Sequence, residues 1–298
     1  MNDNINCRQN TAAQAEQETI TTDTIKEESP DWDVNKKLRY SRQVILKQIG
    51  YEGQTKLLNS KVLVVGAGGL GCPILTYLAG AGVGTIGIVD FDTIGISNLN
   101  RQVLFGTDDV GKKKVDVAQE ALLKLNPDVK IIKYPIRINV DNAEEIIQDY
   151  DVIVDALDNI PSRYVVSDCC YFLKKPLVTG GAMESYGIVR TILPNKSPCF
   201  RCLMPFPPKD GVLQTCSDVG VFGMVTGIIG SVQAMEVVKI IVGFGKLLDD
   251  RIIHFDGSTL KWNEIRLEKS ERCPLCGKNP TITELVQYEV KCKIKGLD

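Results

Sequence analysis

Short apolar runs alternate with amphipathic stretches over the first 180 residues of the chain. The runs are rich in Val, Ile and Leu and predict buried strands at 61–65, 85–90, 129–134, 151–155 and 176–180. Apolar residues at helical spacing predict helices between these strands at 70–81, 112–125, 141–148 and 161–173. This alternation predicts an α/β fold with a doubly wound, mostly parallel, Rossmann-like sheet.

The pattern changes after residue 180. The segments 185–193 and 251–269 predict longer strands, which we expect to extend the sheet in antiparallel fashion. Between them lie a proline-rich loop at 203–218 and a long apolar helix at about 220–242. The second part of the chain is therefore expected to continue the first sheet.

The first 33 residues are polar and acidic. They hold eight acidic and two basic residues and few large apolar side chains. Such a segment cannot bury enough surface to offset the entropy of ordering, so we expect a disordered tail over 1–33. It lacks the apolar core of a signal peptide, which favours a cytoplasmic protein.

Charge and hydropathy give no reason to expect a nucleic acid or a membrane as partner. The net charge of the whole chain is −2. The longest uncharged run, Val219–Met235, has 17 residues and four glycines. It is short for a membrane span, and we expect a buried helix.

At the start of the folded part, apolar residues recur at helical spacing between 35 and 50. Leu38, Ile45 and Ile49 share one face of this predicted helix, and Arg42 falls on the same face. An arginine on an apolar face must reach a partner or extend to solvent.

A glycine-rich loop follows the first predicted strand. Gly66, Gly68 and Gly71 form a G-x-G-x-x-G set, which lets backbone N–H groups approach phosphate at a helix N-terminus. Asp90 ends the second strand, nineteen residues after Gly71, where an acid binds the ribose of a nucleotide. The loop alone does not separate NAD from ATP.

Three lysines, Lys112, Lys113 and Lys114, open the helix predicted at 112–125. Cations in a first turn oppose the helix dipole, so we expect a compensating polyanion. A triphosphate held by Lys114 and Arg101 meets that requirement better than the pyrophosphate of NAD, whereas Lys112 and Lys113 are expected to be solvated.

Asp155 and Asp158 lie at the carboxyl end of the strand at 151–155, where open α/β sheets bind ligands. A carboxylate there can hold Mg²⁺ that bridges phosphates, and Asp158 is the expected ligand. Asp155 instead could cap the following turn together with Asn159.

Ten cysteines without a signal peptide favour metal binding over disulfides. Two C-x-x-C pairs, Cys199 with Cys202 and Cys273 with Cys276, predict a closed and therefore structural zinc site. Cys216 precedes the long helix and is either a nucleophile with a lowered pKa or an inert thiol. The single histidine, in the strand pattern of 251–256, is expected in the core or at an edge.

Together, the motifs resemble the ThiF/MoeB/HesA family of relatives of the ubiquitin-activating enzymes. The resemblance runs from Arg39 to about Cys292. It rests on RYSRQ, GAGGLG, VDFD, SNLNRQ, GKKKV, DALDN, the two C-x-x-C pairs, TCSDVGV and GSVQAMEVVK. Among such enzymes the chain looks most similar to molybdopterin-synthase adenylyltransferases.

The resemblance implies ATP and Mg²⁺ as cofactors, with structural Zn²⁺, and a homodimer. The implied reaction transfers AMP to the C-terminal glycine of a small β-grasp sulfur-carrier protein that ends in Gly-Gly, in molybdopterin or thiamin-type biosynthesis. The chain has no room for the rhodanese domain of longer relatives, so sulfur is expected from a separate donor such as a cysteine desulfurase or rhodanese.

Site residues follow from the same resemblance, position by position. Asp90 corresponds to the ribose ligand, Asp158 to the magnesium-associated aspartate, and Arg42 to an arginine that reaches the ATP of the neighbouring subunit. Cys216 corresponds to a crossover-loop cysteine that some members use for covalent sulfur chemistry. The expected nucleotide site contains Gly66, Gly68, Gly69, Gly71, Asp90, Asp92, Asn98, Arg101, Gln102, Lys114, Asp158 and Asn159.

These assignments divide the chain into a nucleotide-binding part at 34–180 and a part at 181–298 with the carrier-binding surface, the crossover loop and the zinc site. Three other functions stay open: an NAD-dependent oxidoreductase, a family member that dehydrates a modified tRNA adenosine, and a non-catalytic dimeric scaffold. The zinc pairs and the intact crossover loop argue against the tRNA enzyme.

Overall fold

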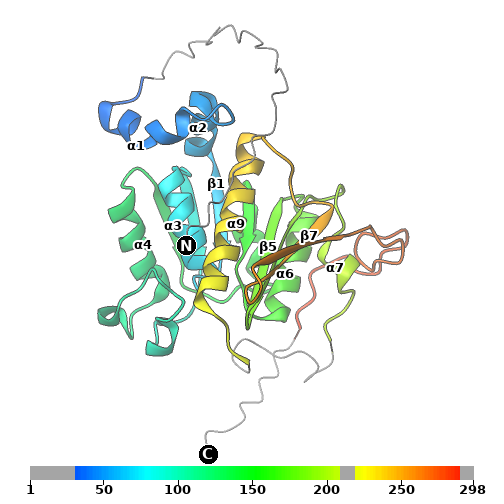
Figure 1. Cartoon of the computed structure of the whole chain (residues 1–298). Coiled ribbons are helices and arrows are strands. Elements are labelled where there is room, and N and C mark those ends of the chain that lie inside the picture. Colours follow the sequence, from blue (N-terminus) through cyan, green and yellow to red (C-terminus); the bar gives the residue numbers. More distant parts are fainter. Residues whose placement is uncertain (1–30, 209–218, 289–298) are drawn as a thin grey trace, which may run out of the picture.

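One eight-stranded sheet runs through the protein (Figure 1). The computed structural model describes residues 31–208 and 219–288. The strand order is β3-β2-β1-β4-β5-β6-β7-β8. The strands are β1 (Lys61–Val65), β2 (Thr85–Val89), β3 (Lys130–Tyr134), β4 (Val152–Asp155), β5 (Leu177–Met183), β6 (Tyr186–Ile192), β7 (Arg251–Asp256) and β8 (Lys261–Arg266).

Strands β1 to β5 form the parallel half of the sheet. β1 pairs in parallel with both β2 and β4, so the strand order reverses beside β1. Open α/β sheets bind ligands at such a switch point, outside the carboxyl ends of the strands. The α/β fold and the parallel sheet predicted from the sequence are confirmed, because every predicted strand up to residue 180 is present.

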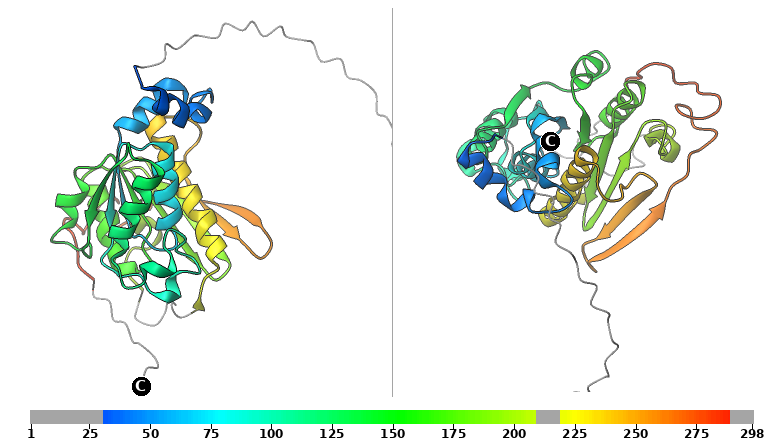
Figure 2. Two further views of the ribbon diagram at one scale, coloured as in Figure 1. Left: turned by 90° about the vertical axis from the view of Figure 1, so that its left-hand side faces the viewer. Right: turned by 90° about the horizontal axis from the view of Figure 1, so that it is seen from above.

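Strands β6 to β8 extend the sheet in antiparallel fashion. The single long strand predicted at 251–269 is wrong, because this segment folds back as the β7–β8 hairpin. Asp256 explains the turn: its carboxylate accepts bonds from the backbone of Ser258 and from the hydroxyls of Ser258 and Thr259. The hairpin projects from the body (Figure 2), and all six residues of β8 are exposed.

Helices cover both faces of the parallel half. One face packs against α3, α4 and α9, and the other against α5 and α6. The helices are α1 (Val34–Val44), α2 (Gly50–Asn59), α3 (Gly71–Ala81), α4 (Lys114–Leu125), α5 (Ala143–Ile147), α6 (Ile160–Phe172), α7 (Phe200–Leu203) and α9 (Gly223–Val242), with short 3₁₀ turns at Ile96–Asn98 and Thr107–Asp109.

By length and composition alone, α9 could cross a membrane, and no other helix of the described ranges could. In the fold it packs against α2, α3 and strands β4 to β6. It begins three residues later than the sequence predicted.

The N-terminal helix differs most from its prediction. It ends at Val44, not near residue 50, and its buried residue is Tyr40. The hydroxyl of Tyr40 accepts a 2.9 Å bond from Asn126, which fixes α1 to the body. Leu38 and Ile45, expected on a buried face, are 65% and 69% exposed.

The folded part also begins before the boundary expected at residue 34. Trp32 makes edge contacts with the rings of Tyr40 and Tyr51. Asp33 caps α1 by accepting a 2.9 Å bond from the backbone of Lys36. The predicted tail therefore contributes its last residues to the fold, and residues 1–30 lie outside the described ranges.

Candidate functional site

The glycine-rich loop connects β1 to α3 at the switch point of the sheet. Gly66 has a φ of +105°, a left-handed conformation that favours glycine. A Cβ atom at Gly71 would lie 2.1 Å from the carbonyl oxygen of Gly66, so no side chain fits there. The loop therefore turns tightly and points the N-terminus of α3 at the carboxyl edge of the sheet, where an anion can bind.

Asp90 fastens the end of β2 to this loop. Its two carboxylate oxygens accept backbone bonds from Ala67 at 2.8 Å and from Asp92 at 2.9 Å. Burial raises the pKa of Asp90, while Lys114 and the two N–H donors act in the opposite direction. A carboxylate has further acceptor sites, so these bonds leave Asp90 able to bind a ribose hydroxyl.

The lysine run is placed differently from the prediction. Helix α4 begins at Lys114, so Lys112 and Lys113 precede the first turn, and the expected clash of three lysines with the helix dipole is wrong. An antiparallel bridge between Thr93 and Lys113 delays the helix. Lys112 lies before the helix and forms an ion pair with Asp109 at 2.9 Å.

Lys114 remains a candidate phosphate ligand. Its side chain is 6% exposed and its ammonium group lies 2.9 Å from Asp92. It lines the same cavity as Asp90. The ammonium group of Lys114 is therefore fixed by an ion pair beside the cavity and is not a solvated lysine, so its position agrees with an anion site.

Arg101 and Gln102 approach the loop from the segment after β2. Arg101 is held by bonds to the carbonyl of Ser97 at 3.1 Å and the side chain of Asn100 at 3.2 Å. Gln102 is 4% exposed, and its Oε1 has no hydrogen-bond partner within the part of the chain that the structure describes. A buried acceptor without a partner is expected to receive a bond from a ligand.

The aspartates after β4 have separate surroundings. Asp155 is buried and accepts bonds from Thr179 at 2.7 Å and from the backbone of Leu157 at 3.0 Å, which is a structural role. Asp158 is exposed and lines the cavity. Asn159 caps α6 by accepting from Ser162 at 3.0 Å.

Arg163 was not singled out from the sequence. Its guanidinium donates to the carbonyls of Leu157 and Gly180, and thus ties the loop that carries Asp158 to strand β5. It lies in the first turn of α6, four residues after Asn159. The signal that could have found it is its position after a strand end, where the carboxyl-edge rule applies equally.

These elements enclose one cavity of about 780 Å³. It is lined by ten of the residues predicted to bind the nucleotide: Gly66, Gly68, Gly69, Asp90, Asp92, Arg101, Gln102, Lys114, Asp158 and Asn159. Three other predicted residues, Gly71, Asn98 and Arg42, do not line it. Asn98 closes its own turn by accepting a 3.0 Å bond from Gly95. Cys216 lies outside the described residues.

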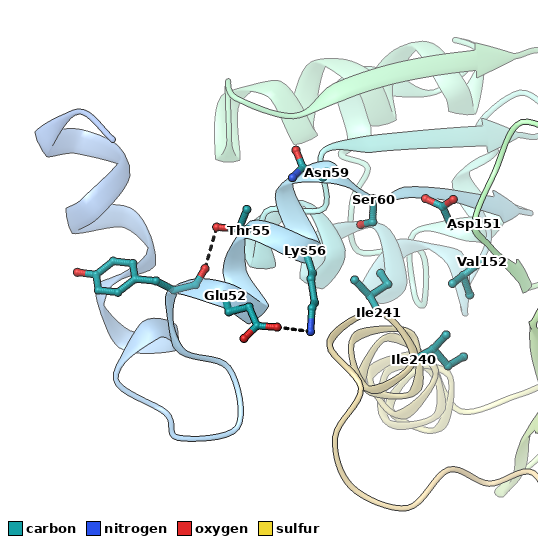
Figure 3. Close-up of a pocket in the computed structure, with 10 residues that line it drawn as sticks. Glu52, Thr55, Lys56, Asn59, Ser60, Asp151, Val152, Ile240 and Ile241 are labelled. Atoms are coloured by element: carbon teal, nitrogen blue, oxygen red, sulfur yellow. Dashed lines mark hydrogen bonds and ion pairs between the residues drawn. The ribbon is translucent and has the colours of Figure 1, made fainter. Parts of the chain in front are cut away.

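A second cavity of similar volume, about 780 Å³, lies between α2 and the end of α9 (Figure 3). Its charged groups already have partners: Lys56 pairs with Glu52 at 2.7 Å, and Asp151 accepts a 2.8 Å bond from the backbone of Lys61. The glycine-rich loop does not line it, and the first turn of α2, which does, carries the acidic Glu52. The cavity beside the loop is therefore the candidate nucleotide site.

The four paired cysteines come together at a distance from this cavity. Their sulfur atoms all lie within 4.8 Å of one another, and the Cys199–Cys273 and Cys202–Cys276 pairs are 3.4 and 3.3 Å apart. A tetrahedral Zn²⁺ with four thiolates at about 2.3 Å spaces its sulfurs by about 3.8 Å. The quartet therefore fits a zinc ion, and backbone N–H groups at Ser270 and Cys276 point at two of the sulfurs.

Arg201, inside the first C-x-x-C pair, was also missed. Its side chain is fully buried and forms a two-pronged ion pair with the equally buried Asp168, at 2.7 to 3.0 Å. It also donates to the hydroxyl of Tyr288 and to the carbonyl of Pro205. The pair anchors the cysteine segment to α6, because a buried arginine needs such partners.

Comparison with known proteins bears on these observations. The family model described as the ThiF family matches residues 40–275. The chain belongs to the ThiF family. The family resemblance drawn from the motifs is therefore confirmed, and the match contains the glycine-rich loop and three of the four cysteines of the quartet, Cys199, Cys202 and Cys273.

Two curated relatives of this ThiF-family chain differ in how much of their own length the chain covers. It is 44% identical over 269 residues to a sulfur carrier protein adenylyltransferase of Thermus thermophilus, and the alignment covers 89% of the chain and 99% of that protein. It is 45% identical over 265 residues to the adenylyltransferase and sulfurtransferase MOCS3 of Aedes aegypti, which covers 89% of the chain. The chain spans only 61% of the length of that mosquito relative.

Solved structures share the ThiF-family fold. The crystal structure of E. coli MccB with ATP has a TM-score of 0.71 and 27% identity, covering 80% of this chain and 74% of that chain. MccB with MccA-N7isoASN has a TM-score of 0.72 and 26% identity, covering 80% and 75%. The parallel sheet with its antiparallel extension is thus shared with an enzyme crystallised with ATP.

Proposed function

We propose that this protein transfers AMP from ATP to the C-terminal glycine of a small β-grasp sulfur-carrier protein and releases pyrophosphate. The observation that carries the proposal is the composition of one cavity: beyond the glycine-rich loop and Asp90, it contains Lys114, Arg101 and Asp158. Two cations and a carboxylate that can hold Mg²⁺ are more than the binding of a pyrophosphate requires. The names of the Thermus and Aedes relatives support the same activity.

The reaction depends on positioning and charge neutralisation. The glycine carboxylate is ionised at neutral pH, so it needs no general base. Its oxygen forms a bond to the α-phosphorus, the bond from that phosphorus to the bridging oxygen breaks, and pyrophosphate leaves with the electron pair. Arg101 and Lys114 offset the phosphate charge, and Asp158 would hold Mg²⁺, which neutralises phosphate oxygens when bound.

The shape of the cavity supports a protein as the second substrate. It extends along the antiparallel strands to Met183, Tyr186 and Ile188, which are 38%, 42% and 40% exposed. His254 lines this end and stacks on Tyr186, with ring centroids 5.6 Å apart. In this proposal an extended tail lies along the cavity past Gly181, while the folded carrier covers the apolar residues.

The decisive experiment measures ATP–pyrophosphate exchange with a purified β-grasp protein that ends in Gly-Gly. We expect exchange and an AMP adduct on the carrier by mass spectrometry. The matched control is the same carrier without its last glycine, which should give neither. Specific binding of NAD, with no exchange for any such carrier, would favour the oxidoreductase instead.

A homodimer is also proposed, with Arg42 of one chain serving the cavity of the other. Arg42 does not line the cavity of its own chain. Helix α1 packs with α2, which leads into the amino end of β1 (Figure 1). The cavity instead is lined by residues that follow the carboxyl ends of β1, β2 and β4. The exposed Leu38 and Ile45 beside Arg42 give a partner chain an apolar surface to cover.

Mixing two inactive variants tests this arrangement. Arg42→Ala and Asp158→Asn chains should each be inactive alone. In a mixed dimer, one of the two sites combines an intact Asp158 with an intact Arg42 from the other chain. Random reassortment makes about half of the dimers mixed, so about a quarter of the original activity should return. A mixture that stays inactive despite proven subunit exchange would place Arg42 within its own chain.

Zn²⁺ in the cysteine quartet, a separate sulfur donor, and a cytoplasmic location complete the proposal. The quartet would have a structural role, because four thiolates leave no position for water. The quartet also disfavours the tRNA-modifying alternative.

A further inference from the structure

Phe91 and Arg137 form a stacked pair at one wall of the nucleotide cavity. Phe91 follows Asp90 directly, and Arg137 lies in the segment after β3. The guanidinium carbon of Arg137 lies 4.0 Å from the centroid of the Phe91 ring. Both residues line the cavity; Phe91 belongs to the VDFD motif, whereas Arg137 belongs to none of the motifs discussed above.

The geometry of the cavity places a nucleotide base at this wall. Phosphates bind at the glycine-rich loop after β1, and the ribose binds at Asp90, which follows β2. The base extends from the ribose on the side away from the phosphates. It therefore lies towards β3, which is the next strand in the sheet and which leads to Arg137.

We propose that Arg137 is a specificity-determining residue, whose guanidinium stacks on the purine base of the bound nucleotide while Phe91 holds it flat. The inference rests on the proposed use of ATP. A guanidinium plane stacks on aromatic rings and on bases alike, and Phe91 occupies only one of its two faces. Ile136 and Ile138 line the cavity beside it and supply apolar contact for the edge of the base.

The surroundings of Arg137 favour a contact with the base over one with phosphate. Arg101 and Lys114 already provide cations at the loop end of the cavity. No ion pair involves Arg137 within the described ranges, so no acidic side chain there holds it away from the base. A bicyclic purine overlaps a guanidinium more fully than a pyrimidine, so ATP and GTP should bind more tightly than CTP and UTP.

Calorimetric titration of the full chain tests the inference, with ATP and inorganic tripolyphosphate as the two probes. Arg137→Ala should weaken ATP binding about tenfold, the order expected for one stacking contact, and leave tripolyphosphate binding unchanged. Arg137→Lys keeps the charge but loses the plane, and should resemble Arg137→Ala. The matched control is Arg266→Ala, an exposed arginine on β8 that does not line the cavity.

Two results would overturn the inference. An equal loss of affinity for both probes would make Arg137 a phosphate cation, and full affinity for ATP in Arg137→Ala would remove it from the site. The proposed function fails separately: a chain that binds ATP but transfers no AMP to a carrier refutes that activity and leaves the binding comparison intact. AMP transfer with unchanged ATP affinity in Arg137→Ala refutes the base contact alone.

Discussion

Replacing Asp158 by asparagine is expected to lower the rate of ATP–pyrophosphate exchange by about 100-fold or more, with little change in stability. The rate falls because the reaction concentrates negative charge on the phosphates, and the substitution removes the carboxylate proposed to hold Mg²⁺ beside them. The free energy of unfolding should be unchanged because the side chain of Asp158 is exposed and the asparagine amide has nearly the same shape as the carboxylate.

Exchange assays over a range of Mg²⁺ concentrations, together with thermal unfolding, check this result. The matched control is Asp149→Asn, an exposed carboxylate that does not line the cavity, and its exchange rate should equal that of the unmodified chain. Near-normal exchange in Asp158→Asn would remove this residue from the mechanism. A large drop in the melting temperature would instead assign it a structural role.

Removing the metal proposed for the cysteine quartet should have the largest effect on stability. The quartet joins positions that are 74 residues apart in the chain, Cys199 to Cys273 and Cys202 to Cys276. A cross-link over a loop of this length stabilises a fold by about 4 kcal/mol in the chain-entropy account. For a protein of this size we expect the melting temperature to fall by about 10 °C.

Elemental analysis and thermal unfolding give the test. The unmodified chain should contain one zinc per chain and lose stability in a strong chelator, and Cys276→Ser should contain little zinc and melt at the lower temperature. Cys7→Ser removes a thiol outside the quartet and is the control. A metal-free chain whose melting temperature does not respond to the chelator would contradict the zinc site.

Much of the fold follows from the sequence because its strands are buried on both faces. Val62 to Val65 are fully or almost fully buried, and such a run is apolar whatever the helices around it do. Where the structure departs from the sequence pattern, a local backbone interaction decides. Asp256 turns the segment after β7 into a hairpin, and the bridge between Thr93 and Lys113 delays the start of α4.

The candidate site was predictable where residues follow strand ends, and less so elsewhere. Asp90 and Asp158 lie in one cavity because the carboxyl ends of parallel strands share one edge of the sheet. Arg201 could not be assigned in this way, since its partner is set by packing: Asp168 lies in another helix. Arg42 lies on an apolar face as predicted, but that face is exposed in the single chain.

The open edges of the sheet have a consequence for solubility. An unpaired edge strand offers backbone donors and acceptors to any other extended chain, and can start aggregation. Both outer strands carry cations: Lys130 and Lys133 in β3, and Lys261 and Arg266 in β8. Like charges repel when two such edges meet, so we expect these side chains, none of which lines the nucleotide cavity, to oppose association through the edges of the sheet, although Lys133 is also paired with Asp116.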